Sequence, residues 1–195
     1  MTFPNHINTI NAYFKAGLSG ATWYNETREQ VAFIFGDDTD LFCDFLAATS
    51  PNTTVKANVT LALKAYKQYK SYEDFTGFMG IIIKMLRTAV INDSTIGHKF
   101  KMGGSKVHNF ARALKGDLDA VVVDRWMLRA FGYDKDIITD KRYRDIEAWC
   151  VAKAEREGMK PAEVQAAIWC GIKSKDERFT DTSKIDDFLP FELAA

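Results

Sequence analysis

Apolar side chains recur at helical spacing along most of this chain, and this pattern limits what it can fold into. Residues three or four positions apart lie on one face of an α-helix, so each such run predicts a helix with one buried face. The early runs are Ile7, Ile10, Tyr13 and Phe14; Leu41, Phe42, Phe45 and Leu46; and Val55, Val59, Ala62, Leu63 and Tyr66. The late runs are Ile146, Trp149, Cys150 and Ala154; and Val164, Ala167, Ile168 and Trp169. The sequence therefore predicts an all-α fold.

Helix-breaking residues divide this pattern into separate elements. Pro51 interrupts it before the third run, Gly116 ends a helix that starts about ten residues earlier, and Pro161 opens a late helix in its first turn. Residues 120–123 form an apolar run that favours a short extended segment, with Asp124 as the N-cap of the helix that follows. We expect about eight to ten helices in a bundle.

The length and composition favour one hydrophobic core. A chain of 195 residues with 47% hydrophobic and 27% charged residues is long enough for one core and short for two. We expect a single helical domain over residues 1–173. Residues 174–195 are charged and weakly periodic, and we expect a tail that is weakly structured or docked on the body.

The cysteine, histidine and hydropathy patterns set the expected compartment. Cys43, Cys150 and Cys170 are odd in number and widely spaced, which favours reduced, buried thiols over disulfides or metal ligands. The histidines also lack ligand spacing, so we expect no metal. No stretch approaches the roughly 20 apolar residues of a membrane span, and the N-terminus does not resemble a signal peptide. The expected location is the cytoplasm, without membrane contact.

Charge is balanced overall but unevenly distributed. The chain has 26 basic and 26 acidic residues, yet five basic residues and no acid lie between Ser94 and Gly116. A second basic set lies on a segment of helical periodicity: Lys56, Lys64, Lys67 and Lys70. Local positive charge is what matters for phosphate binding, although a solvated basic loop has the same pattern.

A glycine pair, a lysine and an aspartate carry the strongest chemical indication. Gly103 and Gly104 precede a helix, where backbone amides can bind a phosphate or simply form a turn. Lys106 falls in the first turn, where the helix dipole is expected to lower its pKa and favour the nucleophilic amine. An exposed lysine that binds a phosphate is the alternative. Asp124 follows 18 positions later, and its alternative role is the helix cap.

Together these residues resemble the helix-hairpin-helix superfamily of base-excision DNA glycosylases, the endonuclease-III-like enzymes. In that family a hairpin ending in Gly-x-Lys starts a helix, and Val-Asp follows the helix, with an arginine five residues beyond the aspartate. The matching residues here are Gly104, Ser105, Lys106, Val123, Asp124 and Arg129. Residues 45–54 also resemble the family's gap-filling loop, with Asn52 as the side chain that replaces a flipped base. Residues 161–173 are similar to its closing helix, so the resemblance covers roughly residues 39–173.

Three departures from the family pattern indicate a divergent branch of the kind that phages carry. Met102 occupies the first glycine position of the hairpin, and Arg125 and Trp126 replace the usual small residue and histidine. No cysteine follows Cys170, so the four-cysteine iron-sulfur cluster of many members is absent. If the chain is phage-encoded, its expected location is the host cytoplasm.

The resemblance implies a DNA N-glycosylase, with an abasic-site lyase step as a further possibility. The enzyme would act on a flipped, damaged or modified base, using Lys106 as nucleophile and Asp124 to stabilise the charge on the sugar. The two side chains are expected to face each other across one cleft. It implies a hairpin at residues 97–116, DNA as partner, a monomer and no cofactor. The DNA contacts would come from Asn52, Lys99, Lys101, Gly103, Gly104, Ser105 and Arg129.

Other functions remain open at this level. One is a phage enzyme that processes hypermodified thymine in DNA, of a transferase or pyrophosphorylase-like kind. Another is a non-catalytic DNA-binding module on the same scaffold, because a fold does not decide a function. Four aromatic residues are candidates for stacking on a flipped base, although aromatic residues at helical spacing more often pack in the core: Tyr66, Phe110, Trp126 and Trp169.

Overall fold

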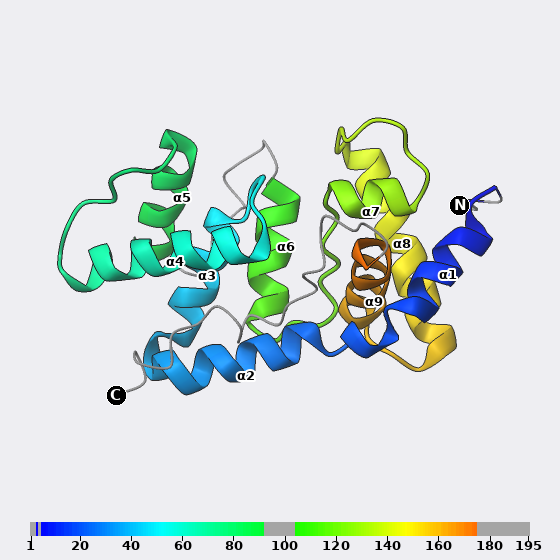
Figure 1. The fold of residues 1–195 in the computed structure, drawn as a ribbon, viewed down its shortest axis with the longest axis horizontal. Helices are drawn as coiled ribbons and strands as arrows, with labels where there is room; N and C mark the ends of the chain where they lie inside the picture. The colour runs from blue at the N-terminus through cyan, green and yellow to red at the C-terminus, as the bar shows by residue number, and fades with distance from the viewer. Residues whose placement is uncertain (1–2, 4, 92–103, 175–195) are drawn as a thin grey trace. The chain divides into compact units, whose positions relative to one another are not determined.

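The computed structural model describes residues 3, 5–91 and 104–174, and for Gly104 and Ser105 it describes the backbone alone (Figure 1). Within these ranges all regular structure is helical and no strand occurs, which confirms the all-α prediction. The α-helices are α1 Ile7–Ala16, α2 Trp23–Phe35, α3 Thr39–Thr49, α4 Val55–Lys70, α5 Gly80–Ile91, α6 Gly104–Leu114, α7 Arg125–Ala130, α8 Asp140–Glu157 and α9 Pro161–Lys173. Two short 3₁₀ helices are η1 Leu18–Gly20 and η2 Gly36–Asp38.

The described residues divide into two compact units. The terminal unit contains residues up to Asn25 together with the chain from Gly116 to residue 174, and the central unit contains the chain from Glu26 to Lys115. The boundary therefore falls inside α2 and again just after α6. The single domain expected over residues 1–173 stays a prediction, and each unit is described by itself below.

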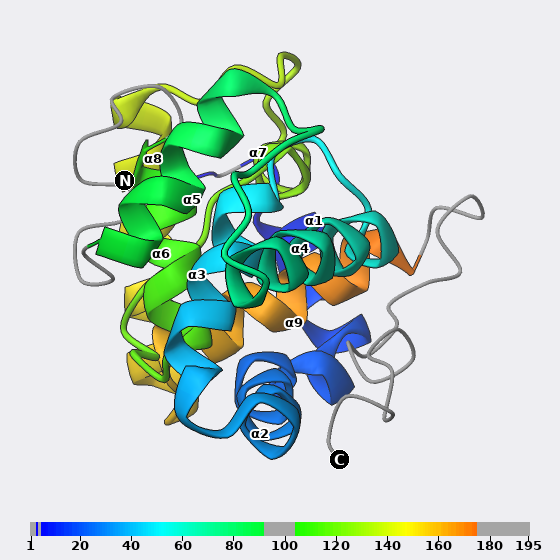
Figure 2. The ribbon, with the colours of Figure 1, turned by 90° about the vertical axis from the view of Figure 1, so that its left-hand side faces the viewer.

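The central unit is built around α3. This helix contacts α4, α5 and α6, which surround it in Figure 2. Nine of its 11 residues are buried, and Phe42, Phe45 and Leu46 are completely inaccessible. A helix that is apolar on nearly every side is stable only in such a position. Its one buried carboxylate, on Asp44, forms an ion pair of 2.9 Å with Lys115, which compensates for its desolvation.

The terminal unit is built around α9, which contacts α1, α7 and α8. Ten of its 13 residues are buried. Two glycines allow α9 to approach the end of α1 closely, since a Cβ atom on Gly171 would lie 1.9 Å from the Tyr13 carbonyl oxygen. A Cβ atom on Gly17 would lie 2.0 Å from the Ala167 carbonyl oxygen. Only glycine fits at this helix crossing.

The predicted element boundaries agree well with the structure. Helix α6 ends at Leu114, before Gly116 with its φ of 95°, and α9 begins at Pro161. Residues 120–123 have no regular structure and lead directly into α7. The remainder of the predicted hairpin, residues 97–103, lies outside the described residues, as does the tail beyond residue 174.

The three cysteines are free and buried, as predicted. Burial raises the pKa of the Cys43 thiol to about 12, and it raises the pKa of the Cys150 thiol as well. Among the helices that the structure describes, none is long and apolar enough to cross a membrane.

Candidate functional site

Lys106 lies in the first turn of α6, as predicted, and its amine is fixed by Ser50. The Nζ atom donates hydrogen bonds to Ser50 Oγ at 2.9 Å and to the Ser50 carbonyl oxygen at 3.3 Å. It also lies 5.8 Å from the centroid of the Phe110 ring. Ser50 is the C-cap of α3, and its own hydroxyl donates to the Ala47 carbonyl at 2.9 Å. The central helix of this unit therefore fixes the lysine.

These two hydrogen bonds are compatible with a nucleophilic amine. A neutral amine has two N–H bonds and one lone pair, so it can donate twice to Ser50 and still attack an electrophile. The ammonium form, with three N–H bonds, can make the same two contacts. The geometry at Lys106 thus suits both a nucleophile and a phosphate-binding cation.

Asn52 lies in the loop between α3 and α4, two residues beyond Ser50. It is exposed and has a φ of 60°, in the left-handed region that asparagine tolerates better than most residues. The loop is fixed on both sides of Asn52, since Thr53 Oγ1 donates to the Ser50 carbonyl at 3.0 Å and Thr54 caps α4. An exposed amide on a rigid loop suits the predicted contact with DNA, which stays a prediction.

The predicted glycine-rich phosphate site is described only in part. Gly104 and Ser105 form the first residues of α6, so their backbone is helical from the position where the sequence predicts the helix start. Lys99, Lys101 and Gly103 lie outside the described residues. Their predicted contacts with DNA therefore stay predictions.

Asp124 is the N-cap of α7, the role that the sequence offered as the alternative to catalysis. Its Oδ1 atom accepts hydrogen bonds from the backbone amides of Trp126 at 2.9 Å and Met127 at 3.0 Å. Its Oδ2 atom accepts from the indole Nε1 of Trp169 at 3.0 Å. A carboxylate has about four lone-pair positions, so three donors orient it without excluding a further interaction. Capping and catalysis are thus compatible.

Aromatic and buried polar side chains pack around Trp169, the indole donor to Asp124. Lys173, one turn beyond Trp169 on α9, is only 3% exposed, and its Nζ atom lies 4.1 Å from the Trp169 ring centroid. A cation over an indole ring polarises it, which strengthens the indole N–H as a donor to the carboxylate. Trp23 lies against Trp169, with the ring centroids 6.2 Å apart.

Tyr24 completes these surroundings. Its hydroxyl donates to Gln165 Oε1 at 2.7 Å, and both residues are buried. Burial, followed by the negative charge of Asp124, raises the pKa of the Tyr24 hydroxyl well above its ordinary value. Tyr24 therefore stays protonated and acts as a hydrogen-bond donor.

Arg129 is the last of the predicted site residues. It forms a bidentate ion pair with Asp136, in which Nε lies 2.9 Å from Oδ1 and Nη2 contacts Oδ2. Its guanidinium group also lies 4.9 Å from the centroid of the Trp126 ring. A phosphate would have to share this guanidinium with Asp136, and the predicted DNA contact stays a prediction.

The four aromatic candidates for base stacking all have packing roles in their own units. Trp169 donates to Asp124, Trp126 lies against Arg129, and Phe110 lies against Lys106. Tyr66 donates to Asp38 at 2.6 Å and packs edge-on against Phe35 and Phe42. Each of the four side chains thus has a structural contact, which is the alternative to base stacking that the sequence left open.

The structure groups the predicted residues in two sets. Lys106 contacts Ser50, two residues before Asn52, in the central unit, whereas Asp124 and Arg129 belong to α7 and its N-cap in the terminal unit. That Lys106 and Asp124 face each other across one cleft stays a prediction.

Two residues that position the candidate groups were not predicted from the sequence, although a local feature of the sequence pointed to each. Ser50 stands at a predicted helix end, and Lys173 stands four residues after Trp169, on the same helix face.

No group of three or more histidine, cysteine, aspartate or glutamate residues within the described ranges is arranged to hold a metal ion.

A family model for proteins of unknown function, DUF7178, matches residues 10–176. No curated protein matches the chain, and no solved structure does. Because the matched residues make up most of the sequence, the chain belongs to the DUF7178 family.

Proposed function

We propose that this protein is a DNA glycosylase of the helix-hairpin-helix type that removes a flipped, damaged or modified base and then cleaves the strand as a lyase. The observation that carries the proposal is that a lysine amine and an aspartate carboxylate, at the family spacing, are each oriented by hydrogen bonds. Lys106 is fixed on Ser50, and Asp124 is fixed on Trp169 and on two backbone amides.

The chemistry assigns a separate role to each group. Cleavage of the N-glycosidic bond leaves positive charge on the sugar, which the Asp124 carboxylate stabilises electrostatically. The Lys106 amine attacks the anomeric carbon as the base departs with the bonding electron pair. The amine then loses a proton, the sugar ring opens to a Schiff base, and β-elimination expels the 3′ phosphate.

Access to the base requires a distorted duplex. A base inside the helix is unreachable, so the nucleotide must be extruded and the gap filled by a protein side chain. Asn52 suits this role because it is exposed on a loop fixed at Ser50, the residue that also positions Lys106.

Borohydride trapping tests this proposal. Borohydride reduces a Schiff base to a stable amine, so the protein should become covalently linked to duplex DNA that contains an abasic site. Lys106→Gln should abolish the adduct, while Lys84→Gln, which removes an exposed lysine of α5 in the same unit, should preserve it.

Three other results would overturn parts of the proposal. An adduct that persists in Lys106→Gln assigns the chemistry to another amine. Base release without any adduct indicates a glycosylase that uses water as the nucleophile. If no base is released from any modified or damaged DNA, the protein is instead a DNA-binding module or an enzyme that processes hypermodified thymine.

A further inference from the structure

Helix α4 presents a face that is basic and free of acidic residues. The helix contains four lysines and no aspartate or glutamate, and Lys56, Lys64 and Lys67 are exposed. Five polar residues follow one another along one face at spacings of three or four positions: Lys56, Thr60, Lys64, Lys67 and Ser71. In a chain with zero net charge, this face is a local concentration of positive charge.

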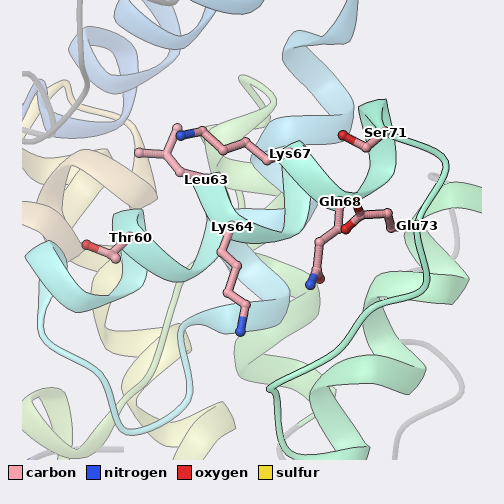
Figure 3. Close-up of a pocket in the computed structure, with 7 residues that line it drawn as sticks. All are labelled: Thr60, Leu63, Lys64, Lys67, Gln68, Ser71 and Glu73. Carbon is pink, nitrogen blue, oxygen red and sulfur yellow. The ribbon is translucent and has the colours of Figure 1, made fainter.

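The same face borders a shallow hollow of about 470 Å³ (Figure 3). Its lining consists of Thr60, Leu63, Lys64, Lys67, Gln68, Ser71 and Glu73. The segment that follows α4 is tied back to the helix, since the Gln68 amide donates to Thr76 Oγ1 at 2.9 Å. Lys64 Nζ donates to the Gly77 carbonyl at 3.4 Å. These contacts fix one wall of the hollow, and its lining carries two lysines and one acidic residue, Glu73.

Lys67 is the best placed of these cations to meet a ligand. No side-chain hydrogen bond or ion pair of Lys67 occurs within the described ranges, and Figure 3 shows it extended from α4 in a different direction from Lys64. Lys70, by contrast, is paired with Asp38 at 2.9 Å. Lys67 is therefore the α4 lysine whose charge is most available to a ligand, and the exposed Lys56 and Lys64 lie along the same face.

We propose that this face of α4 binds the sugar-phosphate backbone of duplex DNA beside the candidate site. Helix α4 begins at Val55, three residues beyond Asn52, and its 16 residues extend about 24 Å. That length corresponds to about seven base pairs at a rise of about 3.4 Å. The lysines favour a polyanion as the ligand. Because α4 follows directly after the loop of Asn52, which is proposed to enter a DNA duplex, the polyanion proposed here is that duplex. The orientation of this duplex rests on the proposed function.

The acidic residue of the hollow, Glu73, provides a test in which neutralising a charge should increase DNA affinity. Glu73 lies two residues after Ser71, beyond the end of α4, and its carboxylate would repel a phosphate there. If the backbone reaches this end of the face, Glu73→Gln should increase DNA affinity by a few fold. An unchanged or reduced affinity would exclude DNA from this end.

Salt dependence of binding is the decisive measurement. Each phosphate contact contributes about 0.9 to the slope of log K against log salt concentration, so neutralising Lys56, Lys64 and Lys67 to glutamine should reduce the slope by up to about 2.7. The matched control neutralises three exposed lysines of the terminal unit: Lys135, Lys141 and Lys160. The control should leave the slope unchanged, and equal slopes in the two triple variants would overturn the proposal.

The single variant Lys67→Gln and a binding measurement that is independent of catalysis complete the experiment. Lys67→Gln should reduce the slope by about 0.9 without disturbing any described side-chain contact, which keeps the test valid if the triple variant unfolds. Fluorescence anisotropy on intact duplex needs no catalysis. A reduced slope without borohydride trapping would therefore retain the α4 surface and refute Lys106 as the nucleophile. Trapping with an unchanged slope would retain the lysine nucleophile and refute the α4 surface.

Discussion

The two units are both packed around one buried helix, but they differ in which part of that helix fixes a candidate group. Each surrounds a single buried helix, α3 in the central unit and α9 in the terminal unit, and each central helix positions one candidate group. Helix α3 uses its C-cap, Ser50, to fix Lys106 beside an exposed loop. Helix α9 uses an interior residue, Trp169, to fix Asp124 among aromatic side chains.

This difference separates two physical tasks. Lys106 is half-buried and is fixed by Ser50, in the same unit as the exposed Asn52 and the basic helix α4. A carboxylate oriented by three donors and backed by a buried lysine over an indole ring is preorganised for a charge that develops during a reaction. Under the proposed function, DNA contact and nucleophilic attack would belong to the central unit, and electrostatic stabilisation to the terminal unit.

The largest expected effect is on catalysis, at Asp124. Asp124→Asn removes the charge but keeps a side-chain oxygen that can cap α7, so base release should slow about 100-fold or more while DNA affinity changes only a few fold. Single-turnover kinetics and anisotropy measure the two quantities. Asp124→Ala should in addition lower the free energy of unfolding by about 1 kcal/mol. Base release at the wild-type rate in Asp124→Asn would leave the carboxylate with the capping role alone.

The next effect is on the stability of the terminal unit. Gly171→Ala should lower the free energy of unfolding by about 3 kcal/mol, because the added Cβ would overlap the backbone of α1. Gly80→Ala, in the central unit, is the matched control, since no atom from outside its own stretch of helix lies within 4 Å of its Cβ position. Urea denaturation measures the free energy of unfolding of both variants. Similar values would show that the backbone at the crossing of α1 and α9 shifts readily to accept the added Cβ atom.

A smaller effect is expected at Trp169. Trp169→Phe removes the indole donor to Asp124 while keeping an aromatic ring, so base release should slow about ten-fold, equivalent to about 1.4 kcal/mol. DNA affinity should stay the same, because the positioning role concerns the carboxylate. A loss of affinity as large as the loss of rate would indicate that Trp169 contacts the DNA instead.

The smallest effect is expected at Ser50. Ser50→Ala removes the closer of the two acceptors of Lys106 but keeps the carbonyl oxygen at 3.3 Å, so adduct formation should slow only a few fold. The lost hydrogen bonds should lower the free energy of unfolding by about 1 kcal/mol. Adduct formation as slow as in Lys106→Gln would mean that the hydroxyl takes part in the chemistry itself.

Local patterns predicted much of the fold, and they could not predict the partners of the candidate groups. The spacing of apolar residues located α1, α3, α4, α8 and α9, and proline and glycine located the start of α9 and the end of α6. The cap at Asp124 also follows from its position before a helix.

The contacts that orient the site join residues far apart in the chain. Lys106 and Ser50 are separated by 56 positions, and Asp124 and Trp169 by 45. Such pairs depend on how helices pack, which no local spacing encodes. Trp169 shows the limit most clearly, because the sequence offered it base stacking or core packing, while its indole N–H donates to the Asp124 carboxylate.

The central claim is that Lys106 and Asp124 act in one reaction, and a double-mutant cycle tests it directly. Base release under single-turnover conditions would be compared among wild type, Lys106→Gln, Asp124→Asn and the double variant. Residues that act as a unit are strongly non-additive, so the double variant should be about as slow as the slower single variant. A double variant whose loss equals the product of the two single losses would show independent roles and contradict the account.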